Sequence, residues 1–172
     1  MAAETAPLAD SGPLKAFLQR ESVLAIALNG DSVNVSVDSQ GPWVAPVLYV
    51  ADDDLNLYFL SAPSTRHIAA LPEDGAIAAT IYRDYNGSWQ SICGVQMRAC
   101  VTQVDEAGRE AIARRYFARF PEVQALIDNP ASEQEQRIGS AFAKSHFYRV
   151  TPSFIRFTNN ADGFSSRTEW RL

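Results

Sequence analysis

The order of the short apolar segments limits most strongly how this chain can fold. Runs rich in Val, Ile, Leu, Ala and aromatic residues recur along it, bounded by Gly, Pro, Asn, Asp and Ser, which is the pattern of β-strands. Helical segments fall between only some of these runs, so strict βαβ alternation is absent and a doubly wound fold is disfavoured. We therefore expect a mainly β (α+β) chain, an antiparallel β-barrel with flanking helices. The predicted strands cover residues 23–29, 43–50, 56–61, 76–82, 91–104 and 147–157.

The helical spacing of apolar residues places the flanking helices. One helix begins at Pro13, a residue that suits a first turn. Another is capped by Asp105 and stopped by Pro121, and carries apolar side chains at every fourth position. The predicted helices cover residues 13–21, 64–71, 105–120 and 132–144.

Proline and glycine mark irregular points along the predicted strands. The strand 43–50 is almost continuously apolar, as expected of a strand buried on both faces. Its Pro46 cannot donate to a ladder, which indicates an edge position, a bulge, or a place where a ligand replaces a strand. An Asn-Gly pair at 86–87 predicts a hairpin turn, and Pro152 interrupts the last strand. The alternating segment 32–37 is typical of a strand or hairpin arm.

Length, charge and cysteine placement restrict the partners and the compartment. At 172 residues the chain is expected to form a single domain, 1–172, in which residues 1–12 are a flexible lead-in. With a net charge of −5 it has no basic stripe for nucleic acid. No apolar run approaches the roughly 20 residues of a membrane helix, and no signal-peptide pattern is present. Cys93 and Cys100 fall on opposite faces of one predicted strand, so we expect free thiols and a cytoplasmic location.

The segment 57–71 (LYFLSAPSTRHIAAL) offers the most chemistry. A strand ends at Ser61 and a helix begins near Thr65, and helix starts present unpaired N–H groups that suit a phosphate. The two hydroxyls add donors, Arg66 can form a forked pair with two phosphate oxygens, and a protonated His67 also donates. Ser and Thr cap helices routinely, and an Arg-His pair in a first turn is often solvated. Local spacing therefore leaves both an anion site and an ordinary helix cap open.

The strand around 92–104 has one apolar and one polar face. Gln96 lies on the polar face with Arg98 and Cys100. If buried, Gln96 needs a partner, which a ligand with carbonyl and ring N–H groups, a subunit interface or solvent would supply. No metal-ligand spacing or local nucleophile motif is present, so no metal and no catalytic residue is assigned. The apolar C-terminal tail is expected to dock, with Trp170 at a dimer interface or beside a ligand ring.

At these residues the chain resembles the pyridoxamine 5′-phosphate oxidase-like flavin-binding split barrels, and in particular a small uncharacterised bacterial branch of them. The matching order is a strand with an apolar-Pro-apolar centre (APVLYV), a strand ending in FLS, a short helix opening with TRH, and a long strand carrying Gln (GVQMRACV). The similarity spans roughly residues 24–104, and the closing HFYRVTPSFIRFTNNADGF with its final RTEW matches the branch.

The resemblance implies a six- to seven-stranded antiparallel split β-barrel that binds FMN as a homodimer, with two equivalent sites at the subunit interface. The phosphate would meet the hydroxyl and basic residues of 61–67, the flavin would run along the backbone of 45–48, and Gln96 would hydrogen-bond the ring. The cofactor-binding residues implied in this way are Ala45, Pro46, Val47, Leu48, Leu60, Ser61, Thr65, Arg66, His67 and Gln96.

Three departures from the family pattern limit what the resemblance implies. The family usually has Lys where His67 stands, which predicts a weaker and more pH-dependent phosphate affinity. Ala45 and Val50 replace the Arg and Lys of the true oxidases, and the C-terminal Arg-x-His substrate signature is absent. We therefore expect an FMN-dependent oxidoreductase of unknown small-molecule substrate that does not oxidise pyridoxamine 5′-phosphate. The alternatives are a haem-binding split barrel with His67 or His146 as iron ligand, and a non-catalytic dimeric ligand-sensing module.

Overall fold

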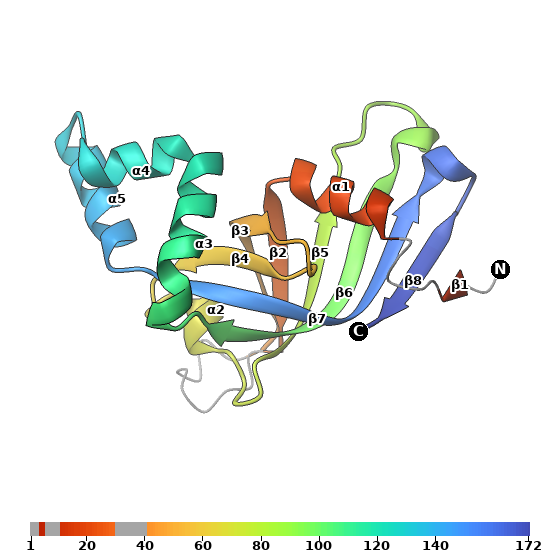
Figure 1. Ribbon diagram of the computed structural model, residues 1–172, viewed down its shortest axis with the longest axis horizontal. Helices are drawn as coiled ribbons and strands as arrows, with labels where there is room; N and C mark the ends of the chain where they lie inside the picture. Colours follow the sequence, from red (N-terminus) through yellow and green to blue (C-terminus); the bar gives the residue numbers. More distant parts are fainter. Residues whose placement is uncertain (1–3, 6–10, 30–40) are drawn as a thin grey trace.

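Eight strands in one curved sheet organise the computed structural model, which describes residues 4–5, 11–29 and 41–172 (Figure 1). The strands are β1 (Glu4–Thr5), β2 (Val23–Leu28), β3 (Trp43–Ala51), β4 (Leu57–Ser61), β5 (Ala76–Tyr82), β6 (Cys93–Gln103), β7 (His146–Asn159) and β8 (Arg167–Arg171). Their order is β1-β8-β7-β4-β3-β2-β5-β6, and pairing of β6 with β7 closes the strands from β7 to β6 into an antiparallel barrel. The predicted mainly β barrel with flanking helices is confirmed.

Two strands change partners along their length, and this splits the barrel. The first part of β7 pairs with β4 through residues 146–150, and its last part pairs with β8 through residues 154–158. Similarly, β3 pairs with β2 through residues 43–48 and with β4 only through residues 49–51. The first part of β3 therefore lies at an edge among the described strands. Of the three positions that Pro46 indicated, the structure shows the edge position, where a strand tolerates a residue without an N–H.

The prediction that residues 43–50 are buried on both faces is wrong for the first half of the strand. Trp43 is 38% exposed and Val44 is 59% exposed, and Pro46 is exposed as well. In this half only the small Ala45 is buried, whereas every side chain from Tyr49 onward is buried where β4 joins the edge. A continuous apolar run thus marks two environments, an uncovered edge and a barrel core.

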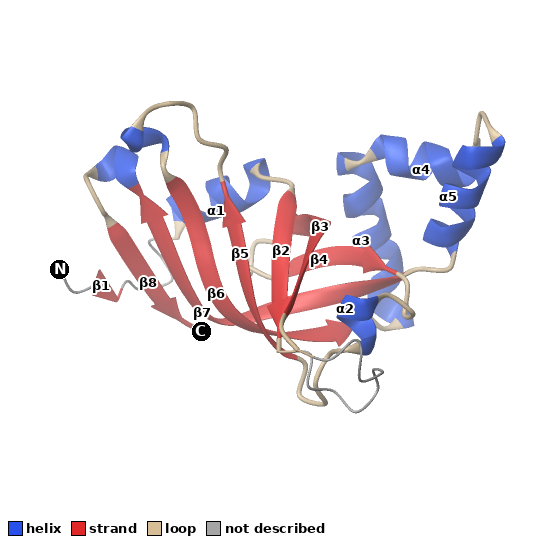
Figure 2. Ribbon diagram, turned by 180° about the vertical axis from the view of Figure 1, so that it is seen from behind, coloured by secondary structure: helices blue, strands red, loops and turns tan. Residues whose placement is uncertain are grey.

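Helices cover the barrel at two places. They are α1 (Gly12–Arg20), α2 (Arg66–Ala69), α3 (Glu106–Arg119), α4 (Pro121–Asp128) and α5 (Glu133–Ala143). α1 packs Leu14, Phe17 and Leu18 into the barrel core, where the Phe17 ring lies 5.3 Å from that of Phe157. α3 covers a second apolar cluster on the outer side of β3, β4 and β7, built on Tyr116 and Phe147. Figure 2 shows α3, α4 and α5 grouped at one end of the molecule, away from β8.

Arg119 joins the two helical groups by capping the C-terminus of α1. Its Nη2 donates to the carbonyls of Arg20 and Glu21, at 2.8 Å each, and its Nη1 donates to that of Gln19. The Tyr49 hydroxyl donates to the Leu18 carbonyl at 2.7 Å. The last carbonyls of a helix lack intrahelical partners, so these donors satisfy groups that would otherwise lose water on packing.

Several sequence predictions about where elements end need correction. Asp105 caps α3 as expected, accepting from the Gly108 N–H at 2.9 Å. Pro121, however, begins α4 at once, because proline suits a first helical turn. The Asn-Gly pair at 86–87 lies in a longer connection, 83–92, that contains a 3₁₀ turn. The last strand is not interrupted at Pro152, since a bulge at Ser153 absorbs the irregularity.

The C-terminal tail forms β8, which the sequence did not predict as a strand. β8 pairs with β7, and Trp170 is only 3% exposed within the barrel core of its own chain. The expectation that Trp170 packs at a dimer interface or against a ligand ring is therefore wrong. Glu169 is nearly as buried and accepts from the Arg156 guanidinium at 2.8 Å, so its charge is paired.

The two cysteines are free thiols, as predicted. Burial raises the pKa of the Cys93 thiol to about 11, so this side chain stays protonated at neutral pH. The predicted strand or hairpin arm at 32–37 lies outside the described residues, as does most of the 1–12 lead-in, of which Glu4–Thr5 pairs with β8.

Gly139 of α5 packs so closely against α4 that replacing it with alanine is expected to destabilise the protein. Gly→Ala inside a helix normally stabilises by about 1 kcal/mol. At Gly139 a Cβ would lie 1.9 Å from the Leu126 carbonyl oxygen, so overpacking of about 1–3 kcal/mol opposes that gain. We expect Gly139→Ala to destabilise the protein by about 1 kcal/mol in urea denaturation. Gly12→Ala, where nothing lies within 4 Å of the new Cβ, is the matched control and should be neutral or stabilising.

Candidate functional site

The site begins where β4 ends. Ser61 is 7% exposed, and its Oγ lies 2.8 Å from His67 Nε2 and 3.0 Å from Thr65 Oγ1. Thr65 Oγ1 is also 3.3 Å from the same imidazole nitrogen and donates to the Ala62 carbonyl at 2.8 Å. The turn after β4 folds the chain back, so residues four and six positions after Ser61 meet its hydroxyl. We call Ser61, Thr65 and His67 the hydroxyl–imidazole cluster.

The helix-cap interpretation of these hydroxyls is wrong. Thr65 occupies the N-cap position of α2, but its side chain makes no capping hydrogen bond. The hydroxyl instead donates to the Ala62 carbonyl and lies within hydrogen-bond distance of Ser61 and His67. An N-cap Ser or Thr ordinarily accepts from an N–H of the first turn, and this one is directed elsewhere. The cluster therefore presents polar side chains to one another, in an arrangement that helix capping does not explain.

The His67 imidazole is held in the neutral form. It is half-buried, and desolvation lowers its pKa below the ordinary value of a histidine. The Phe59 ring lies 6.4 Å from it and in turn stacks on Tyr148 at 5.4 Å. Because a neutral imidazole has one donor and one acceptor nitrogen, the cluster as it stands is a network of exchangeable hydrogen bonds.

Arg66 contacts a residue that sequence analysis did not single out. Its guanidinium carbon lies 3.9 Å from the centroid of the Trp43 ring, which is close enough for a cation–π interaction. Trp43 begins β3, so this contact joins α2 to the exposed edge of the sheet. The sequence carried no signal for it, because the pairing depends on how β3 and the β4–α2 turn are arranged in space.

His146 is the second residue near the site that sequence analysis did not place there. It pairs with Ser61 in the β4–β7 register, so the two side chains lie on the same face of the sheet. Phe59 and Tyr148 are the next pair on that face. Both histidines of the chain thus flank Ser61, one through a hydrogen bond and one across the strands.

The remaining predicted residues lie around this cluster at different depths. Ala45 is buried, Pro46 is exposed, and Val47 and Leu48 are half-buried on the edge part of β3, which lies beside α2. Leu60 is half-buried against the second apolar cluster. Gln96 is exposed on the outer face of β6, opposite Thr80 of β5, so two strands separate it from β3. One chain therefore does not bring Gln96 to the hydroxyl–imidazole cluster.

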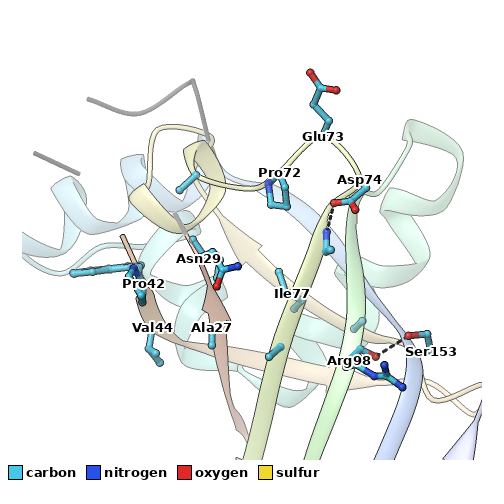
Figure 3. Close-up of a pocket in the computed structure, with 16 residues that line it drawn as sticks. Ala27, Asn29, Pro42, Val44, Pro72, Glu73, Asp74, Ile77, Arg98 and Ser153 are labelled. Atoms are coloured by element: carbon cyan, nitrogen blue, oxygen red, sulfur yellow. Dashed lines mark hydrogen bonds between the residues drawn. The ribbon is translucent and has the colours of Figure 1, made fainter. Parts of the chain in front are cut away.

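A cleft of about 940 Å³ opens beside the edge of β3 (Figure 3). Small side chains of β2 and β5 form much of its floor, with Arg98 and Ser153 at one end. Glu73 and Asp74 lie at its rim, where Asp74 accepts from the Ala76 N–H at 3.0 Å. Trp43 and Val44 also line it. The volume lies within the usual range for small-molecule sites.

Neither a cluster of metal ligands nor a membrane-spanning helix is found among the described residues. In residues 4–5, 11–29 and 41–172, no group of three or more His, Cys, Asp or Glu side chains is placed to hold a metal ion. Over the same ranges, none of the helices combines the length and apolar character needed to cross a membrane.

Comparison with known proteins assigns the fold. A UPF0306 protein of Klebsiella pneumoniae is 28% identical over 133 residues, covering 75% of this chain and 76% of its own. A haem-binding protein of Mycobacterium smegmatis superposes with a TM-score of 0.66 at 10% identity, over 96% of this chain and 58% of its own. An FAD-binding protein of Mesorhizobium loti superposes with a TM-score of 0.54 at 15% identity, over 81% and 87%. The chain has the split-barrel fold. No family model matches the sequence.

Proposed function

We propose that the protein binds FMN, with the cofactor phosphate at Ser61, Thr65, Arg66 and His67, and that it is a flavin-dependent oxidoreductase of unknown substrate. The single observation that carries the proposal is the hydroxyl–imidazole cluster, whose Thr65 hydroxyl does not cap its helix. FAD-binding and haem-binding proteins among the structural neighbours support a bound cofactor in this fold.

The residues at the end of β4 fit a phosphate chemically. Ser61 supplies a hydroxyl donor, the Thr65 hydroxyl would turn from the Ala62 carbonyl to donate, and Arg66 supplies a guanidinium for a charge-assisted pair with phosphate oxygens. The His67 imidazole can take up a proton and donate. Bound FMN would supply the redox chemistry, while the chain binds and orients it. The edge part of β3, whose Trp43 contacts Arg66 of α2, would offer residues 45–48 as a wall for the rest of the cofactor.

The substrate of the true pyridoxamine 5′-phosphate oxidases does not fit this chain. The family resemblance places their Arg and Lys at Ala45 and Val50, which are 7% and 3% exposed. Neither side chain carries a charge or a hydrogen-bonding group, so a second phosphate would lose both expected partners. We therefore propose a different substrate.

A homodimer is part of the proposal. The outer faces of β2, β3 and β5 present a run of small or apolar side chains that the helices leave uncovered. Val23 is 50% exposed, Val44 is 59% exposed and Tyr82 is 67% exposed, and Ala76 and Ala78 are exposed between them. A second copy would bury this face and bring its Gln96 toward the site. The partner could then supply the glutamine that one chain does not bring to its own cluster.

Haem is the second candidate cofactor, because both histidines flank Ser61. His67 is 2.8 Å from the Ser61 hydroxyl, and His146 is the cross-strand partner of the same residue. A neutral imidazole is the form that ligates iron, and burial keeps His67 neutral. Two imidazoles at one end of the barrel thus give haem a specific structural argument.

An absorption spectrum of the purified protein tests these alternatives. We expect stoichiometric uptake of FMN with flavin bands, a dimer by light scattering, and no turnover of pyridoxamine 5′-phosphate. A protein that ignores FMN but gains a Soret band with hemin, lost in His67→Ala or His146→Ala, would establish haem instead. A protein that binds neither cofactor would contradict both the FMN and the haem proposals, and the non-catalytic ligand-sensing module would be the remaining alternative.

A further inference from the structure

The contact between Arg66 and Trp43 has a specific geometry. The guanidinium carbon lies 3.9 Å from the centroid of the indole ring, well within the range of a cation–π contact with the ring face. Arg66 is half-buried, while Trp43 is 38% exposed at the edge of β3. The pair therefore lies at the surface of the molecule. Arg66 directly precedes His67 of the hydroxyl–imidazole cluster in the sequence.

The indole contact and the N–H donors involve different parts of the Arg66 guanidinium. The interaction with the indole uses the face of the planar group, whereas its N–H donors lie in the plane and point outward from its rim. An arginine held in this way can still form a forked pair with two phosphate oxygens. Holding its position before the ligand arrives lowers the side-chain entropy lost on binding, which increases affinity.

Trp43 also borders the cleft. With Asn29, Pro42 and Val44 it lines the wall of the cleft at the end of β2 and the start of β3. The residue thus lies between Arg66 and the space of about 940 Å³ beyond it. A ligand anchored at Arg66 can extend along this wall, so Trp43 stands where the phosphate end and the body of such a ligand meet.

We propose that Trp43 is a positioning residue, which holds the Arg66 guanidinium for the phosphate of the cofactor and so sets the preference for a phosphorylated flavin over the unphosphorylated one. This inference rests on the proposed function. It adds a residue outside the strand–turn–helix segment 57–71, from the exposed edge of β3.

Parallel titrations with FMN and riboflavin test the proposal, because riboflavin lacks the phosphate. We expect Trp43→Leu to weaken FMN binding about 5- to 10-fold, the size of a cation–π contribution, and to change riboflavin binding less than about twofold. Trp43→Phe keeps an aromatic face and should retain FMN affinity within about threefold of the wild type. Trp89→Leu is the matched control: Trp89 is 47% exposed and contacts Phe164 on other loops, so both affinities should stay unchanged.

Three outcomes would overturn the inference, and they differ from failure of the proposed function. Equal weakening of FMN and riboflavin by Trp43→Leu would show that the indole contacts the ring system or supports the strand. Unchanged FMN affinity would show that Arg66 needs no help from Trp43. A loss with Trp43→Phe as large as with Trp43→Leu would remove the cation–π explanation. Failure of the proposed function would appear earlier, as a wild-type protein that does not bind FMN at all.

Discussion

Replacing Arg66 with alanine is expected to weaken FMN binding about 10- to 100-fold. A hydrogen bond to a charged group contributes about 1.5–3 kcal/mol, which corresponds to that range of dissociation constants. Arg66 contacts the Trp43 ring and supplies the guanidinium of the predicted phosphate set. Arg66→Lys should recover only part of the affinity, because an ammonium keeps the charge but cannot form the forked pair. Flavin fluorescence quenching on titration measures both effects.

The control for this prediction is Arg137→Ala, an exposed arginine on α5 far along the chain from the site. It changes the net charge by the same amount and should leave FMN affinity within about twofold of the wild type, since salt screens an exposed charge outside the site. Riboflavin binding should be insensitive to either change. An Arg66→Ala protein that binds FMN as tightly as the wild type would place the phosphate elsewhere in the molecule.

The part of the site that sequence analysis predicted is the part made by local contacts. Ser61, Thr65 and His67 lie close along the chain, and a strand–turn–helix pattern is enough to bring them near one another. Local spacing did not distinguish a helix cap from an anion site, because that depends on which way the Thr65 hydroxyl points. The structure settles the direction of that hydroxyl.

Trp43 was missed, and His146 was named only as a possible iron ligand, because both reach the site through sheet pairing. His146 lies opposite Ser61 because β4 and β7 pair in one particular register, and a shift of one residue would turn its side chain to the other face. Trp43 meets Arg66 because β3 runs along the edge beside α2. Neither relation has a signature in residue spacing, since the partners are remote in sequence.

The sequence predicted the elements that have long patterns, and the prediction failed for elements whose patterns are short. Strand 76–82 and the helix after Asp105 follow clear periodicity and capping. β8 has charged residues at alternate positions, so its sequence alone is typical of an exposed tail. Its strand structure depends on pairing with β7. α4 begins directly at Pro121, where a proline that ends one helix also starts the next.

The affinity for FMN is expected to fall about tenfold between pH 6 and pH 8, because of His67. Burial lowers the pKa of the free imidazole below its ordinary value, so His67 is neutral at pH 7 before the ligand binds. A dianionic phosphate beside it stabilises the imidazolium and raises that pKa in the complex. Between the two pKa values the complex holds one more proton than the free components. The affinity is therefore highest at the acid end and decreases as the pH rises, by at most about tenfold per pH unit.

The surroundings of His67 allow this assignment to be checked by substitution. It faces the hydroxyls of Ser61 and Thr65 and the Phe59 ring, with Arg66 next to it on α2 and His146 across the sheet from Ser61. His67→Lys stays charged over this range and should bind FMN with a flat pH profile, whereas His67→Gln should be flat and as weak as the wild type at pH 8. Below about pH 6 the phosphate itself takes up a proton, so the comparison belongs above that value. A His67→Gln protein that kept the wild-type slope would assign the proton to another group and would remove His67 from the phosphate site.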